Sequence, residues 1–152
     1  RVRKIMNLFN ENIKKFGYFQ TALSVDEMMA KFFGRSILKQ YIRGKPIRFG
    51  LKFWALCTVD GYLLHFDFYC GKNSAAGSKL AKCTQGSRVV LNLLENFFLT
   101  VSPRKVPSYH LYMDNLITSF DLFLHLKKLG LCCTGTIREN RVKKKFYRKK
   151  SS

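Results

Sequence analysis

Apolar residues alternate with other residues along positions 47–59, where every odd position is apolar. A period of two predicts a β-strand. Asp60-Gly61 then gives the signature of a two-residue hairpin turn, and the even positions of 62–70 supply the apolar face of a second strand. A two-residue loop pairs Ala55 with Phe66 and Cys57 with Leu64. Both apolar sets then share one face, so the register and the pattern agree.

Three segments show helical spacing instead. Residues 3–16 place five apolar residues along one stripe, and Gly17 is suited to end that helix. The stripe consists of Ile5, Leu8, Phe9, Ile13 and Phe16. A second helix is predicted from an N-cap at Ser87 to about Leu99. A third begins after Ser119 and ends at Gly130, a residue that favours the C′ position. The Gly-, Ser- and Lys-rich residues 71–87 predict a loop.

Shorter apolar runs complete the sheet. "TALSVD" (21–26) predicts a strand that ends at Asp26, with a turn or loop over residues 27–35. Residues 109–113 lack alternation, as expected of a strand covered on both faces, and Asp114 follows them. Residues 131–137 predict a last strand. The order predicts an α/β fold, in which an antiparallel three-strand meander joins two parallel strands in a mixed sheet flanked by helices.

Two acids end two of these strands. If the strands of Asp26 and Asp114 are parallel neighbours, the acids meet at one rim of the sheet, about 4.8 Å apart by strand spacing. Paired carboxylates could hold a divalent cation against a phosphodiester. The alternative is structural: Asp26 caps the following turn and Asp114 forms an Asx-turn.

Basic residues near these acids could hold phosphates, or could be ordinary solvated charge. They are Arg35, Arg43, Lys45, Arg48 and Lys52.

Composition narrows the class of partner. The 152 residues carry 28 Lys and Arg against 9 Asp and Glu, a net charge of +19, which favours nucleic acid first and an anionic membrane surface second. No apolar run reaches the roughly 18 residues that span a bilayer, so no membrane insertion is expected. Five irregularly spaced cysteines indicate reduced, intracellular thiols rather than a zinc site.

One domain is predicted over residues 1–141, followed by a basic tail, 142–152, that is expected to be flexible. The tail run "KKKFYRKK" suits a nuclear-localisation signal, a phosphate-binding arm or a solvated chain end. Because Arg1 is not an initiator Met, we expect a piece of a longer protein.

Four ordered blocks resemble the transposase domain of the piggyBac family, and the match runs from the first helix to about Arg141. The blocks are "LSVDEMMAKFFGR", "QYIRGKPIRFGLKFWALCTVDGYLLHFDFYCGK", "YMDNLITSFDLFLHLKKLG" and "GTIRENR". The resemblance, closest to the piggyBac-derived proteins of animal genomes, implies an RNase H-like fold. It also implies three catalytic aspartates and Mg²⁺ or Mn²⁺ as cofactor. The first two aspartates fall on Asp26 and Asp114. The implied reaction is hydrolysis at transposon ends, hairpin formation and strand transfer at TTAA, which implies DNA as partner, a nuclear location and a homodimer as one state of the full-length protein.

The chain departs from the family pattern at three points. Ala30-Lys31-Phe32-Phe33 lacks the usual Pro and Lys, and "DNLITS" replaces "DNFFTS". The third aspartate of the family lies on a later helix, and Glu139 is not expected to replace it. The Cys-rich C-terminal DNA-binding module is also absent. The expectation is therefore a truncated catalytic core that is inactive alone. The alternatives are a domesticated or remnant DNA-binding module without catalysis, and a domain that serves only protein interactions.

Overall fold

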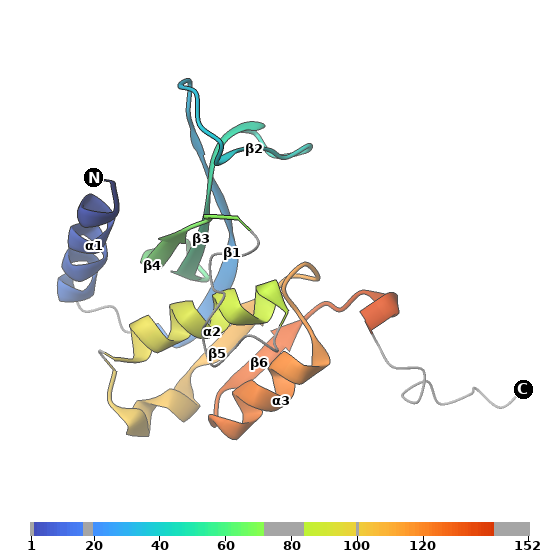
Figure 1. Ribbon diagram of the computed structural model, residues 1–152. Coiled ribbons are helices and arrows are strands. Elements are labelled where there is room, and N and C mark those ends of the chain that lie inside the picture. Colours follow the sequence, from blue (N-terminus) through green and yellow to red (C-terminus); the bar gives the residue numbers. More distant parts are fainter. Residues whose placement is uncertain (1, 17–19, 72–83, 100, 142–152) are drawn as a thin grey trace, which may run out of the picture.

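The structure, a computed structural model, describes residues 2–16, 20–71, 84–99 and 101–141 (Figure 1). The predicted helix end at Gly17, most of the predicted loop at 71–87 and the basic tail lie outside these residues. One six-stranded sheet has the order β2-β3-β1-β5-β6, with β4 also paired to β3. The strands are β1 (Ala22–Lys31), β2 (Lys39–Tyr41), β3 (Phe49–Thr58), β4 (Leu63–Phe68), β5 (His110–Met113) and β6 (Cys132–Gly135). The helices are α1 (Val2–Ile13), α2 (Gln85–Phe98) and α3 (Phe120–Lys128), with short 3-10 turns η1 (Lys14–Phe16), η2 (Pro103–Ser108) and η3 (Glu139–Arg141).

The strand directions confirm the predicted mixed sheet. β3 runs antiparallel to both β1 and β4, while β5 runs parallel to β1 and to β6. An antiparallel meander is thus joined to two parallel strands, and helices flank the sheet (Figure 1). The short strand β2, which pairs with the beginning of β3, was not predicted.

The core lies between one face of the sheet and the helices α2 and α3. Leu23, Val25 and Leu111 reach it from the strands, and Leu93 and Leu126 reach it from the helices. β5 is not covered on both faces, so that prediction was wrong. Leu111 is fully buried, whereas the adjacent Tyr112 is 42% exposed on the other face. This second face is open next to β5 among the described residues.

Helix α1 is turned differently from the prediction. The apolar residues Ile5, Leu8 and Phe9 of the predicted stripe are exposed, and the buried residues of the helix are Met6 and Asn10. Asn10 accounts for the orientation, because it donates to the Phe66 carbonyl (2.9 Å) and accepts from the Phe66 N–H (3.1 Å). The helix thereby satisfies backbone groups of β4 on the side that does not face β3.

The hairpin confirms part of the predicted register. Ala55 pairs with Phe66 as predicted, but a bulge after Leu56 pairs Cys57 with Leu63 instead of Leu64. The turn is longer than two residues: the Thr58 N–H bonds to the Tyr62 carbonyl (2.9 Å), and the Thr58 hydroxyl bonds to the Asp60 carboxylate. These side-chain contacts compete with the tighter turn.

The first strand is much longer than the predicted 21–26. Residues after Asp26 continue in register with β3, from Glu27 opposite Trp54 to Lys31 opposite Gly50. The predicted loop at 27–35 was therefore wrong over its first half. We call residues 28–51 the arm; it comprises the end of β1, the connection that follows, β2 and the start of β3. Figure 1 shows the arm projecting away from α2 and α3.

None of the described helices is both long enough and apolar enough to cross a bilayer.

Candidate metal and nucleic-acid site

The strand register predicts that Asp26 and Asp114 lie near each other. Val25 and Met113 form the last pair between the parallel strands β1 and β5, and both are buried in the core. Successive side chains of a strand point to opposite faces. The next residue of each strand, Asp26 and Asp114, is therefore expected on the open face at one rim of the sheet. The predicted arrangement of strands at this rim is confirmed, and a role in metal binding stays a prediction.

Asp114 forms the Asx-turn of the structural alternative. Its Oδ1 accepts from the N–H groups of Leu116 (3.0 Å) and Ile117 (3.3 Å). These bonds orient the carboxylate, and they all use Oδ1. The Oδ2 atom has no hydrogen bond within the part of the chain that the structure describes. The structural role is thus compatible with metal binding through the second oxygen.

Asp26 does not cap a turn, because β1 continues through it. Its Oδ1 accepts from the Glu27 N–H (2.6 Å), and its Oδ2 lies 3.8 Å from the Lys45 Nζ. The Asp26 side chain is 65% exposed, so this ion pair is weak. Lys45 therefore leaves the Asp26 carboxylate open to solvent and to a cation.

The loop after Asp114 is held by the "GTIRENR" segment. One guanidinium nitrogen of Arg141 donates to the carbonyls of Asn115 (3.1 Å), Leu116 (2.9 Å) and Thr118 (3.1 Å). Arg138 donates to the Asn115 side chain (3.2 Å). The sequence gives no sign of this contact, because the acceptors are backbone carbonyls.

Two glycines leave room for the same loop. A Cβ added at Gly86, in the first turn of α2, would lie 3.0 Å from the Ile117 Cα. One added at Gly135, at the end of β6, would lie 2.5 Å from the Thr118 Oγ1 and 3.0 Å from the Met113 carbonyl oxygen. The loop that follows Asp114 is therefore closely packed between α2 and β6.

Replacing Arg141 by glutamine is expected to loosen this loop. Three carbonyls lose a charged donor, so the free energy of unfolding should fall by about 1–2 kcal/mol. Hydrogen exchange at the Leu116 and Ile117 amides, which bond to Asp114, should accelerate. Arg138→Gln is the control, because Arg138 donates only to the Asn115 side chain and its loss should affect these amides little. We call the three hydrogen bonds from Arg141 to the loop carbonyls the Arg141 clamp. Equal acceleration of exchange in both variants would show that the Arg141 clamp does not hold the loop.

The predicted phosphate-binding residues fall into three groups. Arg35, Arg43 and Arg48 are exposed on the arm. Lys45 lies beside Asp26. Lys52 is separate from them: its Nζ lies 2.8 Å from a carboxylate oxygen of Glu27, and the two side chains are 13% and 9% exposed. Four of the five thus belong to the arm, with Lys45 turned toward Asp26, and their contact with DNA stays a prediction.

The donor set fits a hard cation in part. Asp26 and Asp114 offer carboxylate oxygens, and Mg²⁺ is often held by one or two carboxylates together with water and substrate phosphates. No group of three or more metal-ligating His, Cys, Asp or Glu occurs in the described ranges. Burial, helped by the negative charge of Asp26, raises the pKa of the Cys57 thiol. Cys57 therefore stays protonated near neutral pH and offers no thiolate to a softer metal.

Comparison with known proteins identifies the class. A family model described as "Transposase IS4" matches residues 1–150. The human "PiggyBac transposable element-derived protein 3" is 37% identical over 93% of the chain, and the human "PiggyBac transposable element-derived protein 2" is 31% identical over 95%. The chain spans 23% of the length of each of these relatives. A cryo-EM structure of a piggyBac transposase synaptic complex with hairpin DNA matches with a TM-score of 0.72 and 27% identity, over 96% of this chain and 28% of that one.

The fold and the matches define a transposase-derived domain. More particularly, the chain belongs to the Transposase IS4 family and is of the piggyBac type. The resemblance found in the four sequence blocks is thereby confirmed.

Proposed function

We propose that this domain is the metal-binding part of a piggyBac-type DDD transposase core that acts on DNA. The observation that supports the proposal is the Val25–Met113 pair, because Asp26 and Asp114 are the residues that directly follow this last pair of the parallel strands. The solved relative is a complex with hairpin DNA, which supports DNA as the partner.

Each residue of the site has a separate task. Asp26 and Asp114 would hold Mg²⁺, or Mn²⁺ in its place, and a bound ion would neutralise charge at a phosphodiester. Asp114 presents Oδ2 because the Leu116 and Ile117 amides hold Oδ1. Arg141 keeps the loop closed behind it. Lys45, whose Nζ lies 3.8 Å from the Asp26 carboxylate, would be able to contact a phosphate beside a bound cation.

The finer steps of the proposal come from the family. They are hydrolysis at transposon ends, hairpin formation, strand transfer at TTAA, action as a homodimer of the full-length protein and a nuclear location. The 152-residue chain alone is expected to be inactive, because two carboxylates leave the site one acid short of three.

A second candidate is a domesticated DNA-binding domain without catalysis. The names of the human relatives, transposable element-derived proteins, favour it. Both candidates share the basic surface and differ in whether the acids bind metal.

Mn²⁺ binding, followed by electron paramagnetic resonance, tests the proposal. Asp26→Asn and Asp114→Asn should each weaken binding by about tenfold or more, because each removes a ligand. Glu139→Gln is the charge-matched control and should bind as the wild type does, because Glu139 lies in η3 beyond β6. Binding that neither aspartate variant weakens would overturn the metal site.

A parallel assay with a transposon-end duplex and Mg²⁺ tests the expectation that the 152-residue chain alone is inactive. The chain alone should not cut the DNA. Under the non-catalytic candidate, DNA affinity should be unchanged or slightly higher in Asp114→Asn, since a negative charge near the DNA backbone is removed. Under the catalytic candidate, the same variant should lose divalent-metal binding. Robust cutting by the 152-residue chain would contradict the expectation of inactivity. Mn²⁺ binding that neither aspartate variant weakens would favour the non-catalytic candidate.

A further inference from the structure

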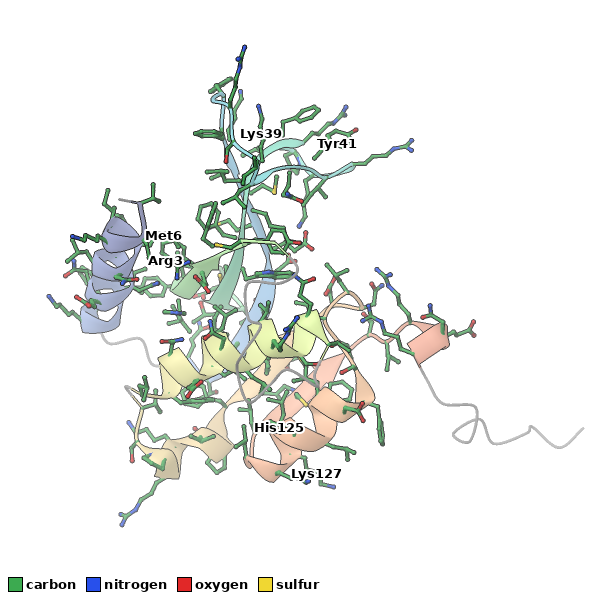
Figure 2. All side chains as sticks on the ribbon, viewed as in Figure 1. Arg3, Met6, Lys39, Tyr41, His125 and Lys127 are labelled. Carbon is green, nitrogen blue, oxygen red and sulfur yellow. The ribbon has the colours of Figure 1, made fainter. Side chains whose placement is uncertain are left out.

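The arm exposes large apolar side chains to solvent. They are Phe33, Ile37, Tyr41 and Phe49, and Ile37 is 98% exposed. Three of the rings have close neighbours within the arm: the Lys31 Nζ lies 4.9 Å from the Phe33 ring centre, and the Tyr41 and Phe49 ring centres are 4.7 Å apart. Figure 2 shows the Lys39 and Tyr41 side chains on the projecting part, away from α2 and α3. Exposed apolar side chains gathered in one projecting segment are typical of an interaction surface.

The charge of the arm selects the chemistry of that partner. The arm carries six basic residues and no acidic residue; the bases are Lys31, Arg35, Lys39, Arg43, Lys45 and Arg48. The nearest acids, Asp26 and Glu27, precede the arm, and Glu27 is already paired with Lys52. A partner that meets both the cations and the apolar side chains must be polyanionic and must also offer apolar or aromatic surface. A nucleic-acid duplex has phosphates outside and stacked bases inside.

The tip of the arm is shaped to enter such a stack. A tight turn presents Ile37, since the Lys39 N–H bonds to the Ser36 carbonyl (3.2 Å) and the Leu38 N–H bonds to the Ser36 Oγ (3.2 Å). Paired strands lead up to the tip, with Lys31 opposite Gly50 and Lys39 opposite Leu51. The tip is therefore pre-ordered, and little conformational entropy would be lost when it inserts.

We propose that the arm is a DNA-unstacking wedge. Phe33 and Ile37 insert between base pairs of a duplex, and Arg35, Arg43 and Arg48 hold the flanking phosphates. Proteins that bend DNA use Phe, Ile and Leu side chains in this way and kink the duplex by about 20–90°. The inference rests on the proposed function only in taking DNA as the partner. It assigns to the arm a distortion of the duplex that does not require metal.

The test uses the 152-residue chain and a duplex of about 30 base pairs with 2-aminopurine beside a central TA step, which unstacks easily. The wild type should raise the 2-aminopurine fluorescence severalfold on binding. The double variant Phe33→Ser/Ile37→Ser should abolish that rise, while its affinity stays within about threefold and its salt dependence is unchanged. Arg43→Gln/Arg48→Gln should do the reverse. Its affinity should fall and its log–log salt slope should shrink by about 2, with the fluorescence of the bound complex preserved.

Leu99→Ser is the matched control, because Leu99 is a large exposed apolar residue at the end of α2, outside the arm. It should change neither fluorescence nor affinity. A full fluorescence rise in the Phe33→Ser/Ile37→Ser variant would overturn the wedge, as would a bound wild-type complex without any rise. Sedimentation of the same proteins tests a second copy as the partner: dissociation of a wild-type dimer by the double variant, with fluorescence unchanged, would also overturn it. Absence of any salt-dependent DNA binding by the wild type would overturn the proposed DNA function as well.

Discussion

Glu27→Gln is expected to lower the free energy of unfolding by about 3 kcal/mol, because it leaves the Lys52 ammonium buried without its counter-ion. The Lys52 Nζ lies 2.8 Å from the Glu27 carboxylate and 4.2 Å from the Trp54 ring centre. Both charged side chains are largely shielded from water, so solvent cannot replace the lost partner. Urea unfolding followed by circular dichroism measures the effect.

Two further variants make the cause specific. Lys45→Gln removes the other ion pair of this region, which is exposed, and should cost no more than about 0.5 kcal/mol. The double variant Glu27→Met/Lys52→Met removes both buried charges and should recover most of the loss, because apolar side chains of similar length can fill the space. Equal losses in Glu27→Gln and Lys45→Gln would show that burial of the pair is not the cause.

The sequence predicted the parts of the fold that depend on local pattern. Apolar residues at every odd position of 47–59, followed by Asp60-Gly61 and apolar even positions, were sufficient to define two strands and the pairing of Ala55 with Phe66. The pattern did not show that Trp54 and Leu56, at the intervening positions, lie in the main core. The position of each acid at the end of an apolar run was also sufficient to predict that the strands before Asp26 and Asp114 are parallel neighbours, with Val25 opposite Met113.

Other features depend on contacts that a single sequence does not show. "EMMAK" has no strand pattern and becomes part of β1 only because β3 is long enough to pair with it. Ile5 and Phe9 have the spacing of a buried stripe, yet Asn10 determines which side of α1 meets β4. The Arg141 clamp has backbone carbonyls as acceptors, and these carry no sequence signal.

The length of β1 explains why Lys52 pairs with Glu27 and does not lie with the basic residues of the arm. Alternation in 47–59 places Lys52 on the same face as Trp54. Once β1 extends past Asp26, Glu27 lies opposite Trp54 on that face and meets the Lys52 Nζ. The predicted end of β1 was five residues too early, at Asp26 instead of Lys31. This error changes the expected role of Lys52, 26 positions after Asp26, from a phosphate-binding residue to the partner of Glu27.

Gly50→Ala is expected to open the outer part of the arm and to lower the free energy of unfolding by about 1–3 kcal/mol, the usual range for overpacking. A Cβ at Gly50 would lie 2.2 Å from the Ala30 carbonyl oxygen and 3.0 Å from the Ala30 carbonyl carbon. Because both are backbone atoms, no side chain can move aside, and β1 and β3 must separate where Lys31 faces Gly50. Hydrogen exchange at the Ile42 amide, which bonds to the Arg48 carbonyl (2.9 Å), should accelerate.

Gly44→Ala is the matched control, since a Cβ at Gly44 has no atom within 4 Å and the cost is only that of its positive φ of 92°. Hydrogen exchange at the Ile42 amide should change less in Gly44→Ala than in Gly50→Ala.

The two proposed activities, metal binding at Asp26 and Asp114 and unstacking of DNA by the arm, depend on opposite ends of β1. Gly50→Ala should abolish the 2-aminopurine signal with Mn²⁺ binding unchanged, because Asp26 lies in the part of β1 that remains paired with β3. If Gly50→Ala lost both activities together, the arm and the edge of the sheet that carries Asp26 and Asp114 would form one cooperative unit. That result would contradict the separate roles proposed for them.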